Sequence, residues 1–203
     1  IGLGVIALSK ADLVDRTQLA ARRAEIVEAV NGTVLDGAQI IACSAVTGEG
    51  LPELVDAIET QLSAASVRRD AGRPRLPIDR GFTMPGFGTV VTGTLSGGTL
   101  TVGDEVAILP AGRISRIRGL QVHGQAVDTA APGRRTAVNL AAVTLGDVRR
   151  GDVLAHPGQW RLTTVFDARL RAVPYLQRPV RHNLRVTVHL GASEVPGRLV
   201  LLD

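Results

Sequence analysis

The sequence predicts an α/β segment followed by all-β domains, and three observations support this fold class. Residues 1–63 alternate apolar, strand-like runs with stretches of helical periodicity, in the order strand–helix–strand–helix of a doubly wound α/β domain. From residue 74 onward, short runs rich in β-branched residues are separated by glycine turns, as in a closed β-barrel. After His156-Pro157-Gly158 the β texture restarts, which predicts the beginning of a second barrel.

The α/β segment opens with residues 5–8 (VIAL), a continuous apolar run consistent with a strand buried on both faces. Asp15 is placed to cap a helix that Asn31-Gly32 ends, because a short polar side chain suits the first position and glycine the last. We expect one face of this helix to be buried. Its apolar stripe consists of Leu19, Ile26, Val27 and Val30.

A second strand and a second helix complete this segment. Residues 38–43 (AQIIAC) are the second candidate for a buried strand. The helix begins at Leu51-Pro52-Glu53-Leu54, since proline suits a first helical turn. Its apolar face consists of Leu51, Leu54, Val55, Ile58 and Leu62.

The barrel begins with a hairpin over residues 77–95 (PIDRGFTMPGFGTVVTGTL). Threonine and valine dominate its second half, and the glycines on either side of Phe87 permit the bend between two extended arms. Ile114 and Ile117 break the strict alternation within residues 113–122, which predicts a bulge there. In the second barrel we expect strands at residues 163–170, 184–190 and 198–202.

The composition narrows the class of protein. The chain has 203 residues, a net charge of +4 and one cysteine, Cys43, which excludes a disulfide framework and indicates a reducing compartment, the cytoplasm. No apolar run approaches membrane-spanning length, and nothing resembles a signal peptide. The basic balance favours polyanionic partners. The chain starts at Ile1 and ends in an apolar run, so we expect a fragment of a longer protein.

Two polar segments follow the two predicted strands, at the edge where α/β folds bind ligands. The first, Ser9-Lys10-Ala11-Asp12, holds the single lysine among 23 basic residues. Its carboxylate can accept two hydrogen bonds from the N–H/NH2 edge of guanine while the lysine stem lies along the base. The second, Ser44-Ala45, offers backbone N–H groups for a carbonyl oxygen such as guanine O6. The alternative is a solvated lysine and a helix-capping aspartate, but the pairing of the segments favours a guanine site.

Asp79 and Arg80 stand at the mouth of the predicted hairpin. One interpretation is that they line a ligand pocket, and the other is that they are ordinary residues of a barrel rim. We predict no metal site, because the four histidines lack metal-ligand spacing, and we expect Cys43 to be a core residue. The histidines are His123, His156, His182 and His189.

Both polar segments resemble the guanine-specificity loops of translational GTPases. PGFGTVVTGTL, followed by VGDEV and PGRRTAVNLA, resembles the second, β-barrel domain of the same proteins. Three further stretches, PIDRGFTMPGFGTVVTGTL, IRGLQVHG and LGASEVPGRLVLLD, are most similar to the selenocysteine-specific elongation factors, the SelB family. The resemblance covers nearly the whole chain, and the second stretch includes His123.

The resemblance implies a division into domains. Residues 1–66 would be the last strands and helices of a P-loop-type G domain, and residues 67–73 a linker. Residues 74–157 would be an EF-Tu-like domain II β-barrel with a pocket for the tRNA 3′ end and its aminoacyl group. Residues 158–203 would be the start of a domain III β-barrel.

The resemblance also implies site residues. The guanine site would contain Ser9, Lys10, Asp12, Ser44 and Ala45, and the aminoacyl pocket Asp79, Arg80 and Arg135. A selenol is ionised near neutral pH and a guanidinium stays charged there, so two arginines favour a selenolate over a serine hydroxyl. Asp79 has two open roles, as acceptor for the α-ammonium or as a group that orients Arg80. Without the resemblance, a salt bridge across the barrel rim would be the preferred explanation of the two arginines.

The function implied is that of a selenocysteine-specific elongation factor, which binds GTP and selenocysteinyl-tRNA and delivers that tRNA to the ribosome. A messenger-RNA hairpin would be a further partner of the complete protein, and we expect no membrane partner. The alternatives are a general EF-Tu-like or initiation-factor-like GTPase, the GTP-dependent large subunit of sulfate adenylyltransferase, and an inert gene fragment. The trio of Asp79, Arg80 and Arg135 favours selenocysteine.

The chain also departs from the family pattern. It has no G-x-x-x-x-G-K-[ST] motif and no switch segments, so it offers no phosphate cradle and no magnesium ligands. We therefore expect no GTP hydrolysis by this chain alone and assign no catalytic residue. Ser9 stands where the family more often has Asn or Thr, a mild change because its hydroxyl can still form local hydrogen bonds.

Overall fold

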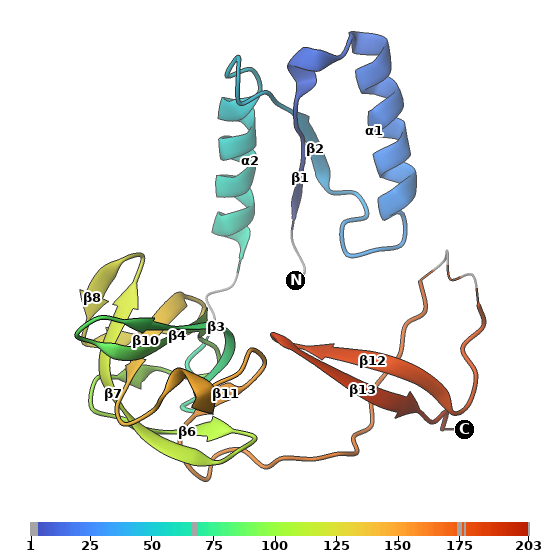
Figure 1. The fold of residues 1–203 in the computed structure, drawn as a ribbon. Coiled ribbons are helices and arrows are strands. Elements are labelled where there is room, and N and C mark those ends of the chain that lie inside the picture. Colours follow the sequence, from blue (N-terminus) through green and yellow to red (C-terminus); the bar gives the residue numbers. More distant parts are fainter. Residues whose placement is uncertain (1–3, 66–68, 174–175, 177, 203) are drawn as a thin grey trace. The chain divides into compact units, whose positions relative to one another are not determined.

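The computed structural model describes residues 4–65, 69–173, 176 and 178–202. These residues fall into two compact units, the first built from residues 1–67 and 169–179 and the second from residues 68–168 and 180–203. In Figure 1 the first unit contains strands and long helices, and the second contains a barrel and a later hairpin. Within the described residues, no helix is long and apolar enough to cross a membrane.

The first unit has the predicted order of strand, helix, strand and helix. Strands β1 (Val5–Leu8) and β2 (Gln39–Ala42) pair in parallel, with Leu8 opposite Ala42. Helix α1 (Arg16–Val30) begins with the predicted cap, since the Asp15 carboxylate accepts from the Gln18 N–H at 2.8 Å. The Gln18 side chain accepts from the Asp15 N–H in return, which completes a capping box. Helix α2 (Leu51–Ala64) carries proline in its first turn.

Burial in this unit is lower than the sequence predicts. Strand β1 is only half-buried and Ala7 is exposed, so the prediction of a strand buried on both faces is wrong. On α1 the stripe is half-buried at best, and Val27 is 56% exposed. On α2 Ala57 is buried, while most of the predicted apolar face is exposed. Two paired strands offer too little surface to cover both helices; the exposed apolar residues of α2 are Leu51, Val55, Ile58 and Leu62.

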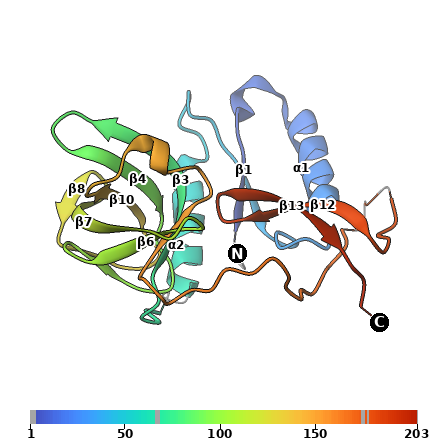
Figure 2. The same ribbon diagram turned by 60° about the horizontal axis from the view of Figure 1, so that its bottom comes forward.

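The barrel of the second unit is a closed sheet of six strands. The order is β10-β4-β3-β11-β6-β7, and pairing of β10 with β7 closes it (Figures 1 and 2). The strands are β3 (Arg75–Met84), β4 (Gly88–Thr94), β6 (Glu105–Leu109), β7 (Arg113–Val122), β10 (Arg135–Leu140) and β11 (Val153–Ala155). Strand β8 (Gln125–Val127) pairs antiparallel with the end of β7, and the short strands β5 (Leu100–Thr101) and β9 (Thr129–Ala130) pair with each other. Two short 3-10 helices are also present among the described residues, η1 (Ala11–Leu13) in the first unit and η2 (Leu145–Asp147) in the second.

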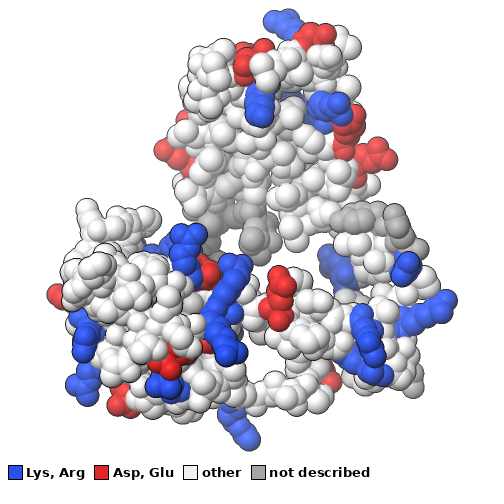
Figure 3. Space-filling model, in the orientation of Figure 1, with Lys and Arg blue, Asp and Glu red and all other residues white. Residues whose placement is uncertain are grey.

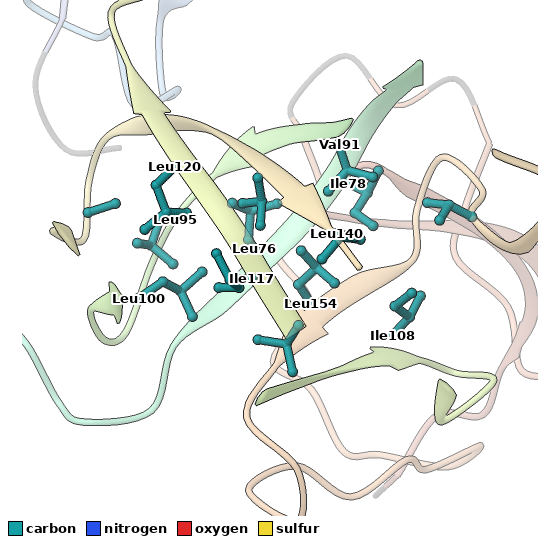
Figure 4. Packing of buried hydrophobic residues seen from close by; sticks show 14 of the residues in the cluster. Leu76, Ile78, Val91, Leu95, Leu100, Ile108, Ile117, Leu120, Leu140 and Leu154 are labelled. Carbon is teal, nitrogen blue, oxygen red and sulfur yellow. The ribbon is translucent and has the colours of Figure 1, made fainter. Parts of the chain in front are cut away.

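The barrel interior is the main hydrophobic core of the described chain. Aliphatic side chains from every barrel strand point inward and pack together (Figure 4). Side chains alternate between the two faces of each strand, which determines which of them enter the core. In β10, for example, Thr136, Val138 and Leu140 are buried and the residues between them face the other side. The fully buried members include Leu76, Ile78, Val91, Leu95, Leu100, Ile108, Ile117, Leu140 and Leu154.

The predicted hairpin is confirmed and contains a bulge that the sequence did not reveal. Strands β3 and β4 pair from Met84 opposite Gly88 back to Ile78 opposite Gly93, and the register shifts between Ile78 and Arg80. Asp79 is therefore the extra residue. In a regular strand Arg80 would share the core face of Ile78, whereas the bulge shifts the alternation by one residue and leaves Arg80 exposed. The bulge predicted in residues 113–122 is confirmed too, where the β7–β10 register shifts next to Ile117.

The chain after the barrel has less strand than predicted. Residues 163–170 form no strand, because an extended segment without a paired neighbour gains no ladder hydrogen bonds. Strand β12 (Leu184–Leu190) matches its predicted range, and it pairs with β13 (Ser193–Leu199). The last strand thus begins earlier and ends sooner than the predicted 198–202.

Part of the predicted linker is fastened to the barrel. Residues 67 and 68 lie outside the described residues, but the N–H groups of Ala71 and Arg73 both donate to the Gly97 carbonyl, at 3.1 and 3.0 Å. The Asp70 carboxylate accepts from the Gly72 N–H and the Thr99 hydroxyl. Residues 70–73 therefore enter the barrel unit as part of its surface.

Candidate functional site

Backbone hydrogen bonds join the two polar segments of the first unit. The Cys43 N–H donates to the Leu8 carbonyl at 2.9 Å, and the Ala11 N–H donates to the Cys43 carbonyl at 3.1 Å. The loop after β1 is thus held beside the loop after β2, at the carboxyl edge where the sequence predicts the guanine site.

Ser44 shapes the second loop from inside. Its side chain is fully buried, and its Oγ accepts from the N–H groups of Val46 and Thr47, both at 3.2 Å. Its own N–H donates to the Glu49 carbonyl at 2.9 Å. Among the described residues no acceptor engages the Ala45 N–H, and Ala45 is exposed. Of the two N–H groups expected to meet a ligand, the structure therefore leaves that of Ala45 available, and Ser44 supports the loop.

Gly50 closes the same loop. Its φ is 72°, a left-handed conformation, and a Cβ there would lie 2.0 Å from the Ala42 carbonyl oxygen. Only glycine permits this close return of the chain onto the end of β2.

Ser9, Lys10 and Asp12 are all exposed at this edge. Lys10 has a φ of 62°, an uncommon value for a residue with a side chain, which indicates a constrained turn. Asp12 makes no side-chain hydrogen bond to any described residue, so it does not act as the helix cap that was the alternative interpretation. The carboxylate is accessible to a ligand.

The second candidate site is centred on Asp79 and Arg135 of the barrel unit. Strand β10 pairs with β4, which pairs with β3, and this neighbourhood brings the two residues together across 56 positions of sequence. Arg135 binds the carboxylate with both ends of its guanidinium: Nη1 donates to Oδ2, and Nη2 donates to Oδ1 at 2.9 Å. Arg135 therefore forms the salt bridge across the barrel rim that was the alternative explanation of the two arginines. Its partner is Asp79, whose carboxylate makes no hydrogen bond to the Arg80 side chain among the described residues.

Thr92 completes the pair. Its hydroxyl donates to Asp79 Oδ1 at 2.9 Å and accepts from Arg135 Nη2 at 3.2 Å. The hydrogen bond from Arg135, helped by that from Thr92, lowers the pKa of Asp79 below its ordinary value, and the same carboxylate raises the pKa of Arg135. The Asp79 side chain is 25% exposed, so its carboxylate is reachable from solvent.

Positive charge exceeds negative charge around this carboxylate. Arg80 is exposed beside the bulge, and Arg150 Nη1 donates to the Asp79 carbonyl at 3.3 Å. Arg135 and Arg150 thus both act on this carboxylate, and among the described residues the Arg80 side chain makes no hydrogen bond to it. Over the face seen in Figure 3, by contrast, basic side chains are spread out with acidic ones between them and form no single patch.

A cavity of about 230 Å³ opens next to Arg135. His123 lies in its wall, at the β7–β8 turn, with a φ of 53°. The sequence placed His123 in the matched stretch without assigning it to a site. The remaining lining residues are Thr92, Gln121, Gly124, Thr136 and Ala137. The sequence analysis did not single out Thr92 or Arg150. The register of β3 with β4 places Thr92 next to Asp79, and the turn that precedes β11 places Arg150 there.

Cys43 and the histidines considered from the sequence lie outside the two candidate sites, except for His123. Cys43 is 5% exposed, which confirms it as a core residue. His156 Nε2 lies 3.2 Å from Asp104 Oδ2, and His189 Nδ1 lies 3.7 Å from Glu194 Oε1. No cluster of three potential metal ligands occurs within residues 4–65, 69–173, 176 and 178–202.

Comparison with known proteins relates this chain to translation elongation factors. Residues 88–155 match the family described as Elongation factor Tu domain 2. A selenocysteine-specific elongation factor from Desulfomicrobium baculatum is 41% identical over 203 residues, which are 100% of this chain and 32% of that protein. Over its whole length the chain is related to the selenocysteine-specific elongation factors. It spans about a third of the length of that relative.

Solved structures of selenocysteine-specific elongation factors agree with this relationship. The crystal structure of a bacterial member, EF-Sec, superimposes with a TM-score of 0.85 at 28% identity, covering 100% of this chain and 34% of that chain. SelB from Methanococcus maripaludis, in complex with the GTP analogue GppNHp, has a TM-score of 0.84 at 28% identity over 96% of this chain and 44% of its own. The predicted fold class is confirmed: part of a G domain, an EF-Tu-like domain II barrel, and the start of domain III.

Proposed function

We propose that this chain is part of a selenocysteine-specific elongation factor, which binds GTP and selenocysteinyl-tRNA and delivers that tRNA to the ribosome. The observation that carries the proposal is the arginine-rich site around Asp79, in a chain related along its whole length to such factors. A messenger-RNA hairpin is a further partner proposed for the complete protein, and the cytoplasm its place of action. The domain limits 1–66, 67–73, 74–157 and 158–203 belong to this proposal.

The charge around Asp79 suits an anionic side chain. Arg135 has five N–H donors, of which Asp79 and Thr92 occupy three. Two N–H groups remain for a selenolate, and the carboxylate fixes the plane of the guanidinium in advance. Exposed Arg80 adds a second permanently charged group on the strand beside the bulge. A serine hydroxyl is neutral and gains little from either group, so the site favours the selenolate.

The α-ammonium of an aminoacyl group suits Asp79. The carboxylate has a lowered pKa and stays ionised at neutral pH, and it is partly exposed. In the proposed complex the ammonium binds Asp79 and the selenolate binds Arg135. The ion pair between Asp79 and Arg135 is then replaced by two ion pairs with the ligand. This arrangement supports our proposal that Asp79, Arg80 and Arg135 form the aminoacyl pocket.

The first unit suits guanine. Accessible Asp12 and the Ala45 N–H lie on adjacent loops, with Lys10 and Ser9 beside them and Ser44 inside the second loop. The complex of the Methanococcus maripaludis SelB with a GTP analogue supports GTP as the nucleotide. Bound GTP would supply the phosphate charge that switches such factors between states. This chain supplies contacts to guanine, and we assign none of its residues to the phosphates or to Mg²⁺.

The test is protection of the aminoacyl ester. In the complete protein with GTP, we expect protection of selenocysteinyl-tRNA against hydrolysis and much weaker protection of seryl-tRNA. Arg135→Ala should abolish the difference by removing the group held by Asp79. Arg113→Ala is the matched control, because Arg113 forms an equally exposed ion pair with Asp147 at 2.9 Å elsewhere on the same barrel. Equal protection of the two tRNAs by the natural protein would exclude the proposal.

A further inference from the structure

The turn between β12 and β13 packs against the barrel. Gly191 lies so close to Pro77 that a Cβ on Gly191 would be 2.9 Å from Pro77 Cβ and 3.0 Å from its Cγ. Ser193, two residues later, lies against Gly151. A Cβ on Gly151 would be 2.8 Å from Ser193 Cβ and 2.9 Å from its Cα. These distances are shorter than van der Waals contact, so both glycines allow an approach that any side chain would prevent.

Both contact points belong to the support of the Asp79 bulge. Pro77 precedes the bulge on β3 and pairs with Val153 of β11. Gly151 lies within the turn of residues 149–152 beside it: its N–H donates to the Ile78 carbonyl at 2.8 Å, and the Ile78 N–H donates to the Asp152 carbonyl at 2.7 Å. Residues 149–152 therefore hold the backbone from which Asp79 projects.

Arg150 extends this support to the bulged residue itself. Its Nη1 donates to the Asp79 carbonyl at 3.3 Å. A bulge has lost regular ladder bonds to its neighbouring strand, so its position depends on such irregular contacts. The β12–β13 turn contacts this region at two points, Pro77 and Gly151.

We infer that the β12–β13 turn, residues 190–193, is a positioning element for Asp79. The turn touches neither Asp79 nor Arg135. It fixes the backbone of β3 and of residues 149–152, and through them the angle at which the Asp79 carboxylate meets Arg135. The consequence for the aminoacyl ligand rests on the proposed function, while the mechanical link between the turn and the bulge does not.

Gly151→Ala in the complete protein tests this link. The new methyl group meets Ser193 and pushes the turn away. Gly103→Ala is the matched control, because Gly103 has a similar φ (94° against 97°) but a Cβ there would meet nothing within 4 Å. Both variants bear the same backbone strain, and only Gly151→Ala disturbs the turn. Gly191→Ala, with Gly112→Ala as its control, repeats the test from the turn side, since Gly112 has a φ of 72° and open space.

The first readout is hydrogen exchange of the peptide that covers residues 76–82. We expect faster exchange in Gly151→Ala and Gly191→Ala than in either control, because the Ile78 N–H loses its fixed partner. Equal exchange in test and control variants would overturn the inference.

The second readout is selectivity in the ester-protection assay. Misplacing a binding group by about 1 Å costs up to roughly 100-fold, so we expect at least a tenfold loss of preference for selenocysteinyl-tRNA over seryl-tRNA in the two test variants. GTP affinity should be unchanged in all four, and this separates positioning from general damage. If the natural protein shows no preference, the proposed function fails, and the exchange of residues 76–82 still decides the inference. Unchanged preference in variants with fast exchange would overturn the positioning role.

Discussion

Thr92 joins both members of the Asp79–Arg135 pair through one hydroxyl group. Thr92→Val keeps the shape and removes both hydrogen bonds, so we expect a loss of about 1 kcal/mol of stability at neutral pH. Thr94→Val is the control, because Thr94 lies on the same strand and its hydroxyl makes no hydrogen bond to a described residue. Urea unfolding measures the difference, and an equal loss in both variants would contradict the assigned role of Thr92.

The same pair predicts a pH dependence of stability. The pKa of Asp79 is lowered from 3.8 in the folded protein, first by its hydrogen bond from Arg135. A lowered folded pKa means that the pair stabilises the protein fully above 3.8 and that this contribution disappears as the pH falls through the lower, folded value. Arg135→Ala should therefore lower the free energy of unfolding at neutral pH. On acidification, the variant should lose less of this free energy than the natural protein does. Unfolding measured on both sides of pH 3.8 tests this. Parallel pH profiles would refute it.

Asp12 allows a test of the guanine site. An ionised carboxylate accepts two hydrogen bonds, whereas an asparagine amide offers one acceptor and one donor face. Asp12→Asn should weaken GTP binding by at least about tenfold, the effect of losing a charged hydrogen bond, and should permit binding of a xanthine nucleotide, whose C2 carbonyl matches the amide. Nucleotide titration of the complete protein measures both. Asp56→Asn, an exposed change in the same unit, is the control. Equal GTP affinity in the two variants would remove Asp12 from the site.

Among the elements, the β3–β4 hairpin depends on a close approach at Gly93. A Cβ there would lie 2.2 Å from the Pro77 carbonyl oxygen and 2.7 Å from Leu76 Cδ2. Gly93→Ala should destabilise the barrel by about 1–3 kcal/mol, the usual cost of overpacking. Gly119→Ala is the control, because Gly119 also lies in a barrel strand but faces open space. Urea midpoints compare them, and similar midpoints would show that the hairpin tolerates the shift.

The elements also show where sequence patterns succeed. The residues of β1 and β12 were predicted to the exact residue, because each is a short apolar or alternating run between clear turn signals. Burial was predicted less well. The stripes of α1 and α2 are real, but a pattern states only which side chains prefer burial and cannot supply the surface that covers them. The absent strand at residues 163–170 fails for the same reason, since β-branched composition does not provide a partner strand.

On the scale of the whole molecule, the candidate site exists only because the barrel closes. Asp79 and Arg135 lie on β3 and β10, and β4 stands between these strands. The local sequence around Asp79 and Arg135 does not show that they lie close together, and only the family resemblance links them. The bulge at Asp79 was invisible for a related reason: a bulge is defined by register with a partner strand, which a single sequence does not contain.

The distribution of buried residues predicts unequal stability along the chain. The core cluster runs from Leu76 to Leu154 within the barrel, whereas the first unit buries few apolar side chains and β12–β13 is a two-stranded ribbon. Amide exchange in the 203-residue chain should therefore be slowest across residues 77–153. Both helices and the β12–β13 ribbon should exchange faster. Uniform protection along the chain would contradict this distribution.

Trp160 offers an independent probe of the same inequality. It is the single tryptophan of the chain and lies in the barrel unit, with the guanidinium carbons of Arg73 and Arg75 at 4.6 and 5.1 Å from its ring centre. Its fluorescence therefore reports on the barrel, whereas the far-ultraviolet helix signal comes chiefly from α1 and α2 of the other unit. In a urea titration the helix signal should be lost at lower concentration than the fluorescence signal. Coincident transitions would mean that the two units unfold as one.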